Sequence, residues 1–471
     1  MKRLLMAAAA ACAVLPALAQ TVSNATFVNG LTLSGAALDL SNGSDFDRRV
    51  GYFSDLYYDR ARNEWWGLSD RGPGGGTLPY ETRVQRFTLD VDANSGAISN
   101  FQIVQTVKFS DSGQAFSGLA PTTPGVLGRS FDPEGFVINP VTGRLLVTDE
   151  YGPSLKEFDR NGQLVRSYAT PADLVPRVGG SADYSAAPPT LSSGREPNRG
   201  LEALAISPDG RYAYAVLQNG TVQDGWTAAS RGTYTRIVKY DTQTGAAVGQ
   251  YAYKLESAAQ GRGISALVAL GNDKFMILER NNRGIGVGAA LAGADKNVFL
   301  IDLAAATDVT GLNLPATGAF AGAVSKGAKV IDLDANTLAA LGNQSPEKWE
   351  GLAIGPQLAS GQYLVLAGTD NDYSVTQNAT GAQFDVYYRF SNADPFASSI
   401  QCPAGQTAGC FLTANNATAA TLGANDKLLP GVLHAYTATI DGYVSSVPEP
   451  QAVLLMLAGL LGVGIAARPR H

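Results

Sequence analysis

Short apolar runs separated by polar turns recur along the chain from about residue 25 to residue 447. Apolar and polar residues alternate or form short continuous runs, and the period of an amphipathic helix is almost absent. Several turns end in a glycine suited to positive φ, as tight hairpins require; they lie at residues 92–96, 139–143, 207–210 and 241–245. The pattern predicts an all-β protein built from many short strands.

Five segments of this pattern can be superimposed, and they begin at Phe53, Asp132, Asn198, Gly261 and Lys348. In each segment a polar approach precedes an apolar strand, a hairpin turn and a second apolar strand that ends in polar residues. The spacing of about 60 to 90 residues exceeds that of a minimal four-stranded blade, so we expect inserted loops. Radially stacked sheets bury their faces and protect their edges, so the repeat predicts a β-propeller.

We expect the ring of sheets to close by pairing of the first strand of the domain, residues 25–34, with its last strand, residues 431–443. This pairing would add a sheet to the repeats and give a six-bladed propeller, with five or seven blades as alternatives. About 430 residues could also form two domains, so a two-domain β-sandwich protein is the competing architecture. Residues 171–198 and 391–426 are expected to be surface loops that shape a binding site.

The first 19 residues have the pattern of a cleavable signal peptide. Lys2 and Arg3 precede an apolar run that ends in Ala17-Leu18-Ala19, whose small side chains suit a signal peptidase. The run is too short for a permanent membrane anchor. We therefore expect cleavage after Ala19 and export of the domain formed by residues 20–446.

The C-terminal 25 residues contain a second apolar segment. Residues 451–467 are long enough for a transmembrane helix, and the basic residues Arg468 and Arg470 follow them. Together with the preceding residues 447–450, Val-Pro-Glu-Pro, this order resembles the PEP-CTERM sorting signal. The resemblance implies processing by an exosortase in a Gram-negative bacterium that makes exopolysaccharide. It predicts transient anchoring in the inner membrane and delivery to the cell surface or the extracellular matrix; an ordinary C-terminal anchor is the alternative.

Between these two ends the domain carries 31 basic and 40 acidic side chains, a net charge of about −9. Nucleic acid demands a cationic surface, so an acidic domain without basic runs is unsuited to bind it. We expect a monomer whose partners are the exosortase, a small phosphate or other ester substrate and, in one reading, exopolysaccharide.

The domain is poor in histidine and cysteine. His434 is its only histidine, and no G-x-S-x-G motif occurs. This excludes multi-histidine zinc sites, and it leaves a Ser-His-Asp triad only if His434 supplies the base. His434 lies in an apolar, strand-like segment, which indicates a structural role. Cys402 and Cys410 lie close together, and in an oxidising compartment they predict a local disulfide.

Acidic residues recur at equivalent positions of the repeats. Glu134, Glu202 and Glu350 begin the first strand in three repeats. Further acidic residues close the second strand: Asp70-Arg71, Asp149-Glu150, Glu279-Arg280 and Asp370-Asn371-Asp372. In a propeller such positions converge on the axis, so the carboxylates would form a ring that a cation must neutralise. Hard oxygen ligands in a flexible ring suit calcium. The alternative is that these residues only begin and end strands, without a metal.

At these residues the chain resembles the phytase-like family, described by the phrase "esterase-like activity of phytase". The resemblance spans most of residues 45–445 and is carried by DPEGF, VTDEYGPSL, NRGLEALAISPDGRYAYAVLQ, WEGLAIGP and GTDND. It implies a β-propeller, bound calcium and a hydrolase. Carried over by position, it favours Glu134, Glu202, Glu350 and Asp370 as metal-binding or substrate-facing groups, with Asp149 and Glu150 beside them. One departure is Ser265, which stands in the fourth repeat where the others carry glutamate.

Arg71, Arg199 and Arg280 adjoin the acidic positions. A guanidinium offers paired donors, so we expect these arginines to bind phosphate oxygens in a calcium-dependent phosphoesterase or esterase. Alternatively each pairs with a neighbouring acid. Two further functions stay open: a non-catalytic binding module of the polysaccharide matrix, and a propeller lactonase, because a fold alone does not define chemistry.

Overall fold

The computed structural model describes residues 20–227, 231–256, 262–287, 290–378 and 381–446. The predicted signal peptide and the predicted sorting signal, with its helix at 451–467, lie outside these residues. Within the described part, no helix is long and apolar enough to span a bilayer. Its only helices are single 3₁₀ turns, η1 (Val222–Asp224), η2 (Leu333–Ala335), η3 (Ala339–Leu341) and η4 (Asp372–Ser374). The all-β prediction is confirmed.

Five four-stranded antiparallel sheets make up most of the described chain, and we call them blades 1 to 5. Blade 1 comprises β2 (Asp55–Asp59), β3 (Glu64–Leu68), β4 (Arg83–Val91) and β5 (Ile98–Lys108), and blade 2 comprises β8 (Pro133–Ile138), β9 (Leu145–Asp149), β10 (Ser154–Phe158) and β11 (Leu164–Ser167). Blade 3 comprises β14 (Leu201–Ile206), β15 (Tyr212–Leu217), β16 (Tyr234–Asp241) and β17 (Ala247–Lys254), and blade 4 comprises β18 (Gly263–Gly271), β19 (Lys274–Arg280), β20 (Lys296–Asp302) and β21 (Ser325–Asp332). Blade 5 comprises β22 (Trp349–Gln357), β23 (Tyr363–Thr369), β29 (Gly431–Asp441) and β1 (Thr21–Leu33). The glycines that end the predicted hairpin turns, such as Gly96 and Gly245, have positive φ as expected.

The blades form a ring. The inner strands β2, β8, β14, β18 and β22 each contact the inner strands of the two neighbouring blades, and β22 contacts β2. A cluster of buried apolar side chains fills the space between each pair of adjacent blades, including blades 5 and 1. The chain is therefore a β-propeller, and the two-domain sandwich alternative is wrong.

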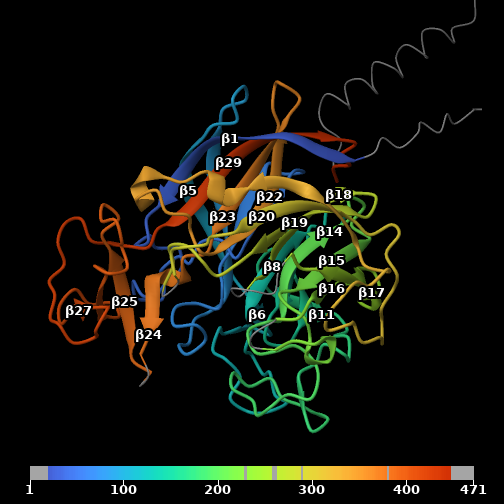
Figure 1. Cartoon of the computed structure of the whole chain (residues 1–471), viewed down its shortest axis with the longest axis horizontal. Coiled ribbons are helices and arrows are strands. Elements are labelled where there is room, and N and C mark those ends of the chain that lie inside the picture. The colour runs from blue at the N-terminus through green and yellow to red at the C-terminus, as the bar shows by residue number, and fades with distance from the viewer. Residues whose placement is uncertain (1–19, 228–230, 257–261, 288–289, 379–380, 447–471) are drawn as a thin grey trace, which may run out of the picture.

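The two ends of the domain close the ring. β1 pairs with β29 from Thr21 opposite Asp441 to Leu33 opposite Gly431, which confirms the predicted pairing (Figure 1). β29 also pairs with β23, so β1 and β29 complete blade 5. The expectation of six blades was wrong for this reason. The fifth repeat supplies only β22 and β23, and the strands expected to form an additional sheet are its missing outer half.

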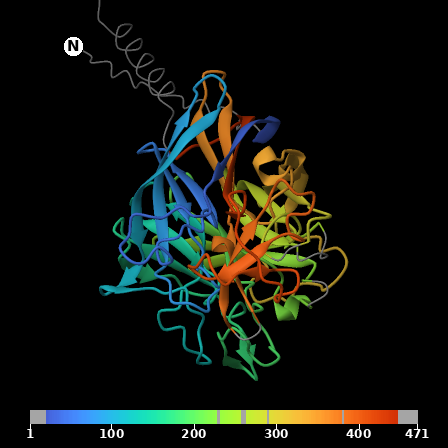
Figure 2. The ribbon, with the colours of Figure 1, turned by 90° about the vertical axis from the view of Figure 1, so that its left-hand side faces the viewer.

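A smaller sheet is inserted between β23 and β29. It comprises β24 (Val375–Gln377), β25 (Gln383–Tyr388), β26 (Ile400–Pro403), β27 (Phe411–Leu412) and β28 (Lys427–Leu428). It stands beside the blades in Figure 1 and lies in front of them in Figure 2. The predicted disulfide joins Cys402 to Cys410 here. Residues 391–426 are thus partly strand; their short strands are hidden in a sequence rich in Ala, Thr and Asn.

The remaining strands are short pairs in the loops between blades. They are β6 (Ser110–Asp111) with β7 (Gln114–Ala115), and β12 (Arg177–Val178) with β13 (Ser181–Ala182). Apart from the second pair, residues 171–198 are the irregular loop that the composition predicts.

His434 belongs to the core of blade 5. Its ring is fully buried, with the ring centroids of Trp349 and Phe27 at 4.6 and 4.9 Å. Burial lowers the pKa of His434 to about 3, so the ring is neutral at physiological pH. This agrees with the structural role predicted for it.

The closure of the ring can be tested on Phe27, which packs from β1 onto His434 and Tyr436. We expect Phe27→Ala to lower the free energy of unfolding by about 2 to 3 kcal/mol, because it removes apolar contacts between the two ends of the domain. The measurement is urea unfolding of residues 20–446. Val141→Ala is the control, since Val141 is 74% exposed and should change stability by less than about 0.5 kcal/mol. Equal effects of the two substitutions would contradict the importance of this closure.

Candidate functional site

Four of the five inner strands begin with a β-bulge. The bulges contain Glu134 in β8, Glu202 in β14, Ser265 in β18 and Glu350 in β22. A bulge interrupts the alternation of side chains and so redirects one of them. The equivalence of these positions, inferred from the repeats, therefore has a structural basis.

Blade 1 departs from this pattern, because β2 pairs with β3 without a bulge. Its Asp55 is buried, and its carboxylate accepts hydrogen bonds of 2.8 Å from the backbone N–H groups of Leu56 and Phe136. Asp55 thus fastens β2 to β8. Blade 1 contributes to the site through Asp70 and Arg71, which follow β3.

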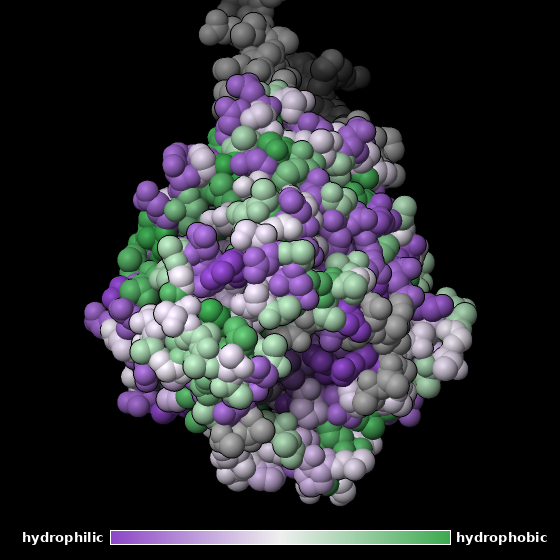
Figure 3. Space-filling view, turned by 60° about the vertical axis from the view of Figure 1, so that its left-hand side comes forward, coloured by the Kyte–Doolittle hydropathy of each residue, from purple (hydrophilic) through white to green (hydrophobic). Residues whose placement is uncertain are grey.

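The bulges surround one end of the central channel. All five blades line a cavity of about 180 Å³ there. Its charged residues are Arg71, Glu134, Glu150, Arg199, Glu202, Arg280, Glu347, Lys348 and Glu350. A strongly hydrophilic hollow is visible on the face shown in Figure 3. The other end of the channel is lined mainly by apolar segments of the inner strands, with Tyr443, Val444 and Ser446 beside them. Arg60 also lines this other end, so charged residues are concentrated at one end of the channel but not confined to it.

Glu134, Glu150 and Glu202 form a compact group of acids. One carboxylate oxygen from each lies within 4.8 Å of the other two, and all three residues are buried. Glu202 accepts a hydrogen bond of 2.7 Å from Gln218, and Glu150 accepts one of 3.2 Å from the backbone N–H of Gly200. The second oxygen of Glu202 and of Glu150 has no hydrogen-bond donor, although the guanidinium of Arg71 lies 3.9 Å from that of Glu150. These free oxygens are suited to a hard cation.

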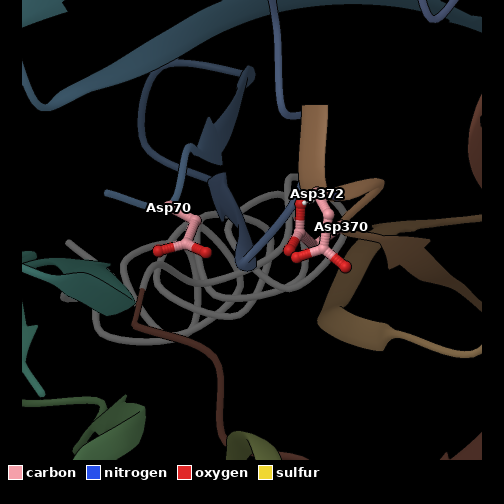
Figure 4. Close-up of side chains that lie close together, drawn as sticks. All are labelled: Asp70, Asp370 and Asp372. Atoms are coloured by element: carbon pink, nitrogen blue, oxygen red, sulfur yellow. Dashed lines mark hydrogen bonds between the residues drawn. The ribbon is translucent and has the colours of Figure 1, made fainter. Parts of the chain in front are cut away.

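A second group of carboxylates is neutralised by a lysine side chain of the protein. Asp70 is far in the sequence from the pair Asp370 and Asp372, and one carboxylate oxygen of each lies within 4.8 Å of the others; Figure 4 shows the three side chains. The ammonium group of Lys348 lies 2.9 Å from Asp370 and 2.6 Å from Asp372. The protein thus supplies its own positive charge here, and we do not retain Asp370 as a metal ligand.

A left-handed turn holds Asp372 in place. Asp372, Tyr373 and Ser374 have φ values of 46°, 54° and 55°. Such a conformation costs a residue with a side chain about 1 to 2 kcal/mol. It is held by the Tyr373 hydroxyl, which donates to the carbonyl of Asp70, and by Asn371, which donates to the carbonyl of Leu429.

Two of the predicted arginines are paired with acids. Arg71 donates a hydrogen bond of 2.5 Å to Asp132. Arg280 forms an ion pair with Glu350 and donates a hydrogen bond of 2.8 Å to Ser265. The charges of Arg71 and Arg280 are therefore largely neutralised, as the simpler alternative expected, and Glu350 is not retained as a metal ligand.

Arg199 is different. Its guanidinium donates to the side-chain oxygen of Gln218 and to the carbonyl of Asn198, and its Nε has no acceptor. Among the described residues no carboxylate lies within ion-pair distance of it. Arg199 therefore brings an unbalanced positive charge into the cavity.

This arrangement can be compared with known proteins. Residues 48–373 match the model of the phytase-like family, described as esterase-like activity of phytase. The chain belongs to the phytase-like family. The match begins before blade 1 and ends in the left-handed turn that carries Asp372, so it includes every charged residue of the cavity.

Several other proteins are similar to this phytase-like chain. An "uncharacterized secreted protein" of Arthroderma benhamiae is 25% identical over 413 residues, which cover 69% of this chain and 80% of that protein. A putative 6-phosphogluconolactonase of Bacteroides uniformis is 12% identical, with 70% and 80% of the two chains covered and a TM-score of 0.29. A family 43 arabinoxylan arabinofuranohydrolase of Bacillus subtilis is 10% identical, with 68% and 62% covered and a TM-score of 0.34. At such scores the two structures carry no argument about this site.

Burial dominates the electrostatics of the glutamates in the phytase-like site. It raises the pKa of Glu134 well above its ordinary value, and Asp70 and Glu202 raise it further. Burial likewise raises the pKa of Glu202, and the charge of Glu150 adds to this effect. Asp70 behaves differently: burial raises its pKa, but Arg71 and Lys348 outweigh it and lower the pKa. The glutamate group is thus short of positive charge, and a proton or a cation can supply it.

Asp149 lies outside the carboxylate groups. Its buried side chain accepts hydrogen bonds of 3.1 Å from the backbone N–H groups of Asp132 and Tyr151 and from the hydroxyl of Ser154. These bonds secure the end of β9, so we assign Asp149 a structural role and do not retain it as a ligand.

The predicted site lacks three charged residues that the structure brings there: Asp132, Glu347 and Lys348. Asp132 and Lys348 each precede a bulge glutamate by two positions. These residues belong to the polar approach that the repeats share. Their signal in the sequence is their place two or three positions before the bulge glutamate.

The shortage of positive charge predicts a pH-dependent stability. At pH values below 4.5, the ordinary pKa of glutamate, Glu134 and Glu202 are protonated in both the folded and the unfolded state. Their contribution to stability is then fully present. It is lost as pH rises through the higher folded-state pKa values, by about 1.4 kcal/mol per unit of difference. Without divalent cations, the wild type should therefore lose stability relative to the Glu134→Gln, Glu202→Gln double variant between pH 5 and pH 8.

Thermal unfolding of residues 20–446 at several pH values, with chelator and with calcium, measures this effect. Calcium should abolish the relative loss, because it replaces the proton. Parallel pH profiles of the wild type and the double variant would contradict the assigned charge shortage.

Proposed function

We propose that this phytase-like domain is an exported hydrolase that cleaves a phosphate ester, or a related ester, in the cavity at the charged end of its channel. The observation that carries the proposal is the presence, in one cavity, of the unpaired Arg199 and of buried carboxylate oxygens without donors. Such a site offers a positive group to an anionic ester and a place for a cation beside it. Membership of the phytase-like family supports this reading.

We propose Glu134, Glu150 and Glu202 as ligands of Ca²⁺. The fit rests on the free oxygens of Glu150 and Glu202 and on the closeness of the three carboxylates. Bound there, calcium would neutralise the carboxylates and stabilise negative charge on the ester oxygens.

The chain's own residues orient the substrate in this proposal. Arg199 binds the anionic oxygens, since its guanidinium retains an unused donor at Nε. The Arg280–Glu350 pair, held by Ser265, forms the neighbouring wall.

The same proposal places the domain outside the cytoplasm. Its support is the sequence pattern of a signal peptide and of a PEP-CTERM signal processed by an exosortase, together with the secreted relative. We propose a monomeric domain at the surface of a Gram-negative bacterium, in contact with exopolysaccharide.

Phosphate release by residues 20–446 from a simple phosphomonoester and from phytate tests the activity. We expect release with calcium and none with chelator. Glu134→Gln or Glu202→Gln should lower kcat/KM by about 100-fold or more, because each removes a ligand and charge stabilisation at the reacting group. Glu81→Gln is the control, since the Glu81 side chain is 52% exposed and pairs with Lys108 on the surface.

Each other outcome favours a different function. Tight binding of exopolysaccharide without hydrolysis of any ester would replace the hydrolase by a matrix-binding module. Opening of a lactone without release of phosphate would favour a lactonase.

Arg199 can be tested separately. Arg199→Ala should raise KM about 10-fold or more, because a charge-assisted hydrogen bond contributes about 1.5 to 3 kcal/mol. Arg199→Lys should restore part of the affinity, since it returns the charge without the planar donor pair. Steady-state kinetics give both values, and unchanged KM in Arg199→Ala would remove this residue from the site.

A further inference from the structure

Glu347 is a charged residue of the cavity that the proposed function does not use. It precedes β22 and lines the cavity from blade 5, whereas Glu134 and Glu202 line it from blades 2 and 3. In the ring of blades, blade 5 neighbours blades 4 and 1. Glu347 therefore faces the proposed cation ligands across the channel axis rather than lying among them.

The carboxyl group of Glu347 is buried and unpartnered. The residue is only 9% exposed. Within the described ranges its carboxylate has no hydrogen bond and no ion pair, although Arg280 and Lys348 lie nearby. Its backbone is fixed, since its N–H donates a hydrogen bond of 2.8 Å to the carbonyl of Ile285. A polar group that is held in a cavity and has no partner in the protein is available to a ligand.

Gly286 makes room for this carboxyl group. A Cβ atom at position 286 would lie 2.3 Å from the Oε2 atom of Glu347 and 2.8 Å from its Cβ atom. Any side chain at this position would force Glu347 to move. The position of the carboxyl group is thus set by packing against a glycine and not by a charged partner.

Charged and titratable groups approach Glu347 from several elements. They are Arg280 on β19, Lys296 on β20, Lys348 and Glu350 at β22, Asp372 in η4 and Tyr388 on β25. Burial raises the pKa of Glu347, and the charge of Asp372 adds to this, while Arg280 and Lys348 oppose both. Glu347 therefore retains its proton to a higher pH than an exposed glutamate, as a general acid requires.

We propose that Glu347 is the general acid that protonates the leaving group of the ester, an inference that rests on the proposed function. In this step the oxygen of a water molecule bonds to phosphorus and the bond from phosphorus to the leaving oxygen breaks. The proton of the Glu347 carboxyl group moves to the leaving oxygen, which departs as an alcohol. The attacking water gives its surplus proton to the solvent, and the Glu347 carboxylate then takes up a proton from the solvent.

The test compares two substrates that differ in their need for an acid. Glycerol phosphate has a poor leaving group, and 4-nitrophenyl phosphate has a good one. In calcium-loaded protein of residues 20–446, Glu347→Gln should lower kcat about 100-fold on glycerol phosphate. On 4-nitrophenyl phosphate it should lower kcat less than about fivefold, because 4-nitrophenolate leaves without a proton. The fall of kcat at high pH should disappear in the variant.

Two further variants separate chemistry from structure. Glu347→Asp keeps an acid in a shorter side chain and should restore part of the activity on glycerol phosphate. Gly286→Ala retains the Glu347 residue but forces its carboxyl group to move. It should cause the same substrate-dependent loss without removing an acid. Glu81→Gln remains the surface control.

The outcomes distinguish this role from the proposed function. Equal losses on both substrates, or none, would overturn the role of Glu347 while the hydrolase stands. Absence of hydrolysis by the wild type on either substrate would overturn the proposed function and this role with it. If Glu347→Gln does not fold, Gly286→Ala decides, and unchanged activity of that variant on glycerol phosphate would overturn the role.

Discussion

Apolar packing between the faces of neighbouring blades is the interaction on which the rest of this structure depends. Each interface buries side chains from two sheets, and burial stabilises by about 25 cal/mol per Å² of apolar surface. Contact of β22 with β2 closes the ring, and the pairing of β1 with β29 completes blade 5. The ring in turn brings the first residues of the inner strands to a single opening. Glu134 and Glu350, more than two hundred positions apart, line the same cavity for this reason.

Bringing these residues together creates an electrostatic problem that the protein solves unevenly. Lys348 of blade 5 pairs with Asp370, and Arg71, which follows β3 of blade 1, pairs with Asp132, which precedes β8 of blade 2. At blade 4 the bulge carries Ser265, and Arg280 beside it reaches Glu350. The departure of the fourth repeat from glutamate thus has a physical reason. Ser265 adds no negative charge and accepts a hydrogen bond from Arg280, which pairs with Glu350. Glu150 of blade 2 has only Arg71 at 3.9 Å, and among the described residues Glu134 and Glu202 have no ion pair, so the shortage of positive charge is concentrated on these two glutamates.

The inserted sheet is coupled to this site through the left-handed turn before β24. Asn371 and Ser374 bind Leu429 and Val386 of the inserted region, while the Tyr373 hydroxyl binds the backbone of Asp70 in blade 1. Backbone strain of this kind persists only where the surroundings fix it, and it clusters at functional sites. The insertion therefore supports the position of Asp372, although it contributes no strand to the ring.

The sequence by itself determined the strands, the closing pair of β1 and β29, the disulfide of Cys402 and Cys410 and the register of Glu134, Glu202 and Glu350. These features follow from local periodicity, turn chemistry and repetition, which a linear pattern preserves. The number of blades required the tertiary structure, because it depends on which strands share a sheet. The partners of each charge also required it: Arg199 and Arg280 are alike in the sequence, but only Arg280 meets a carboxylate. Burial and pairing are properties of the whole ring, and they decide which acids of the repeats are satisfied and which are available to a cation or a substrate.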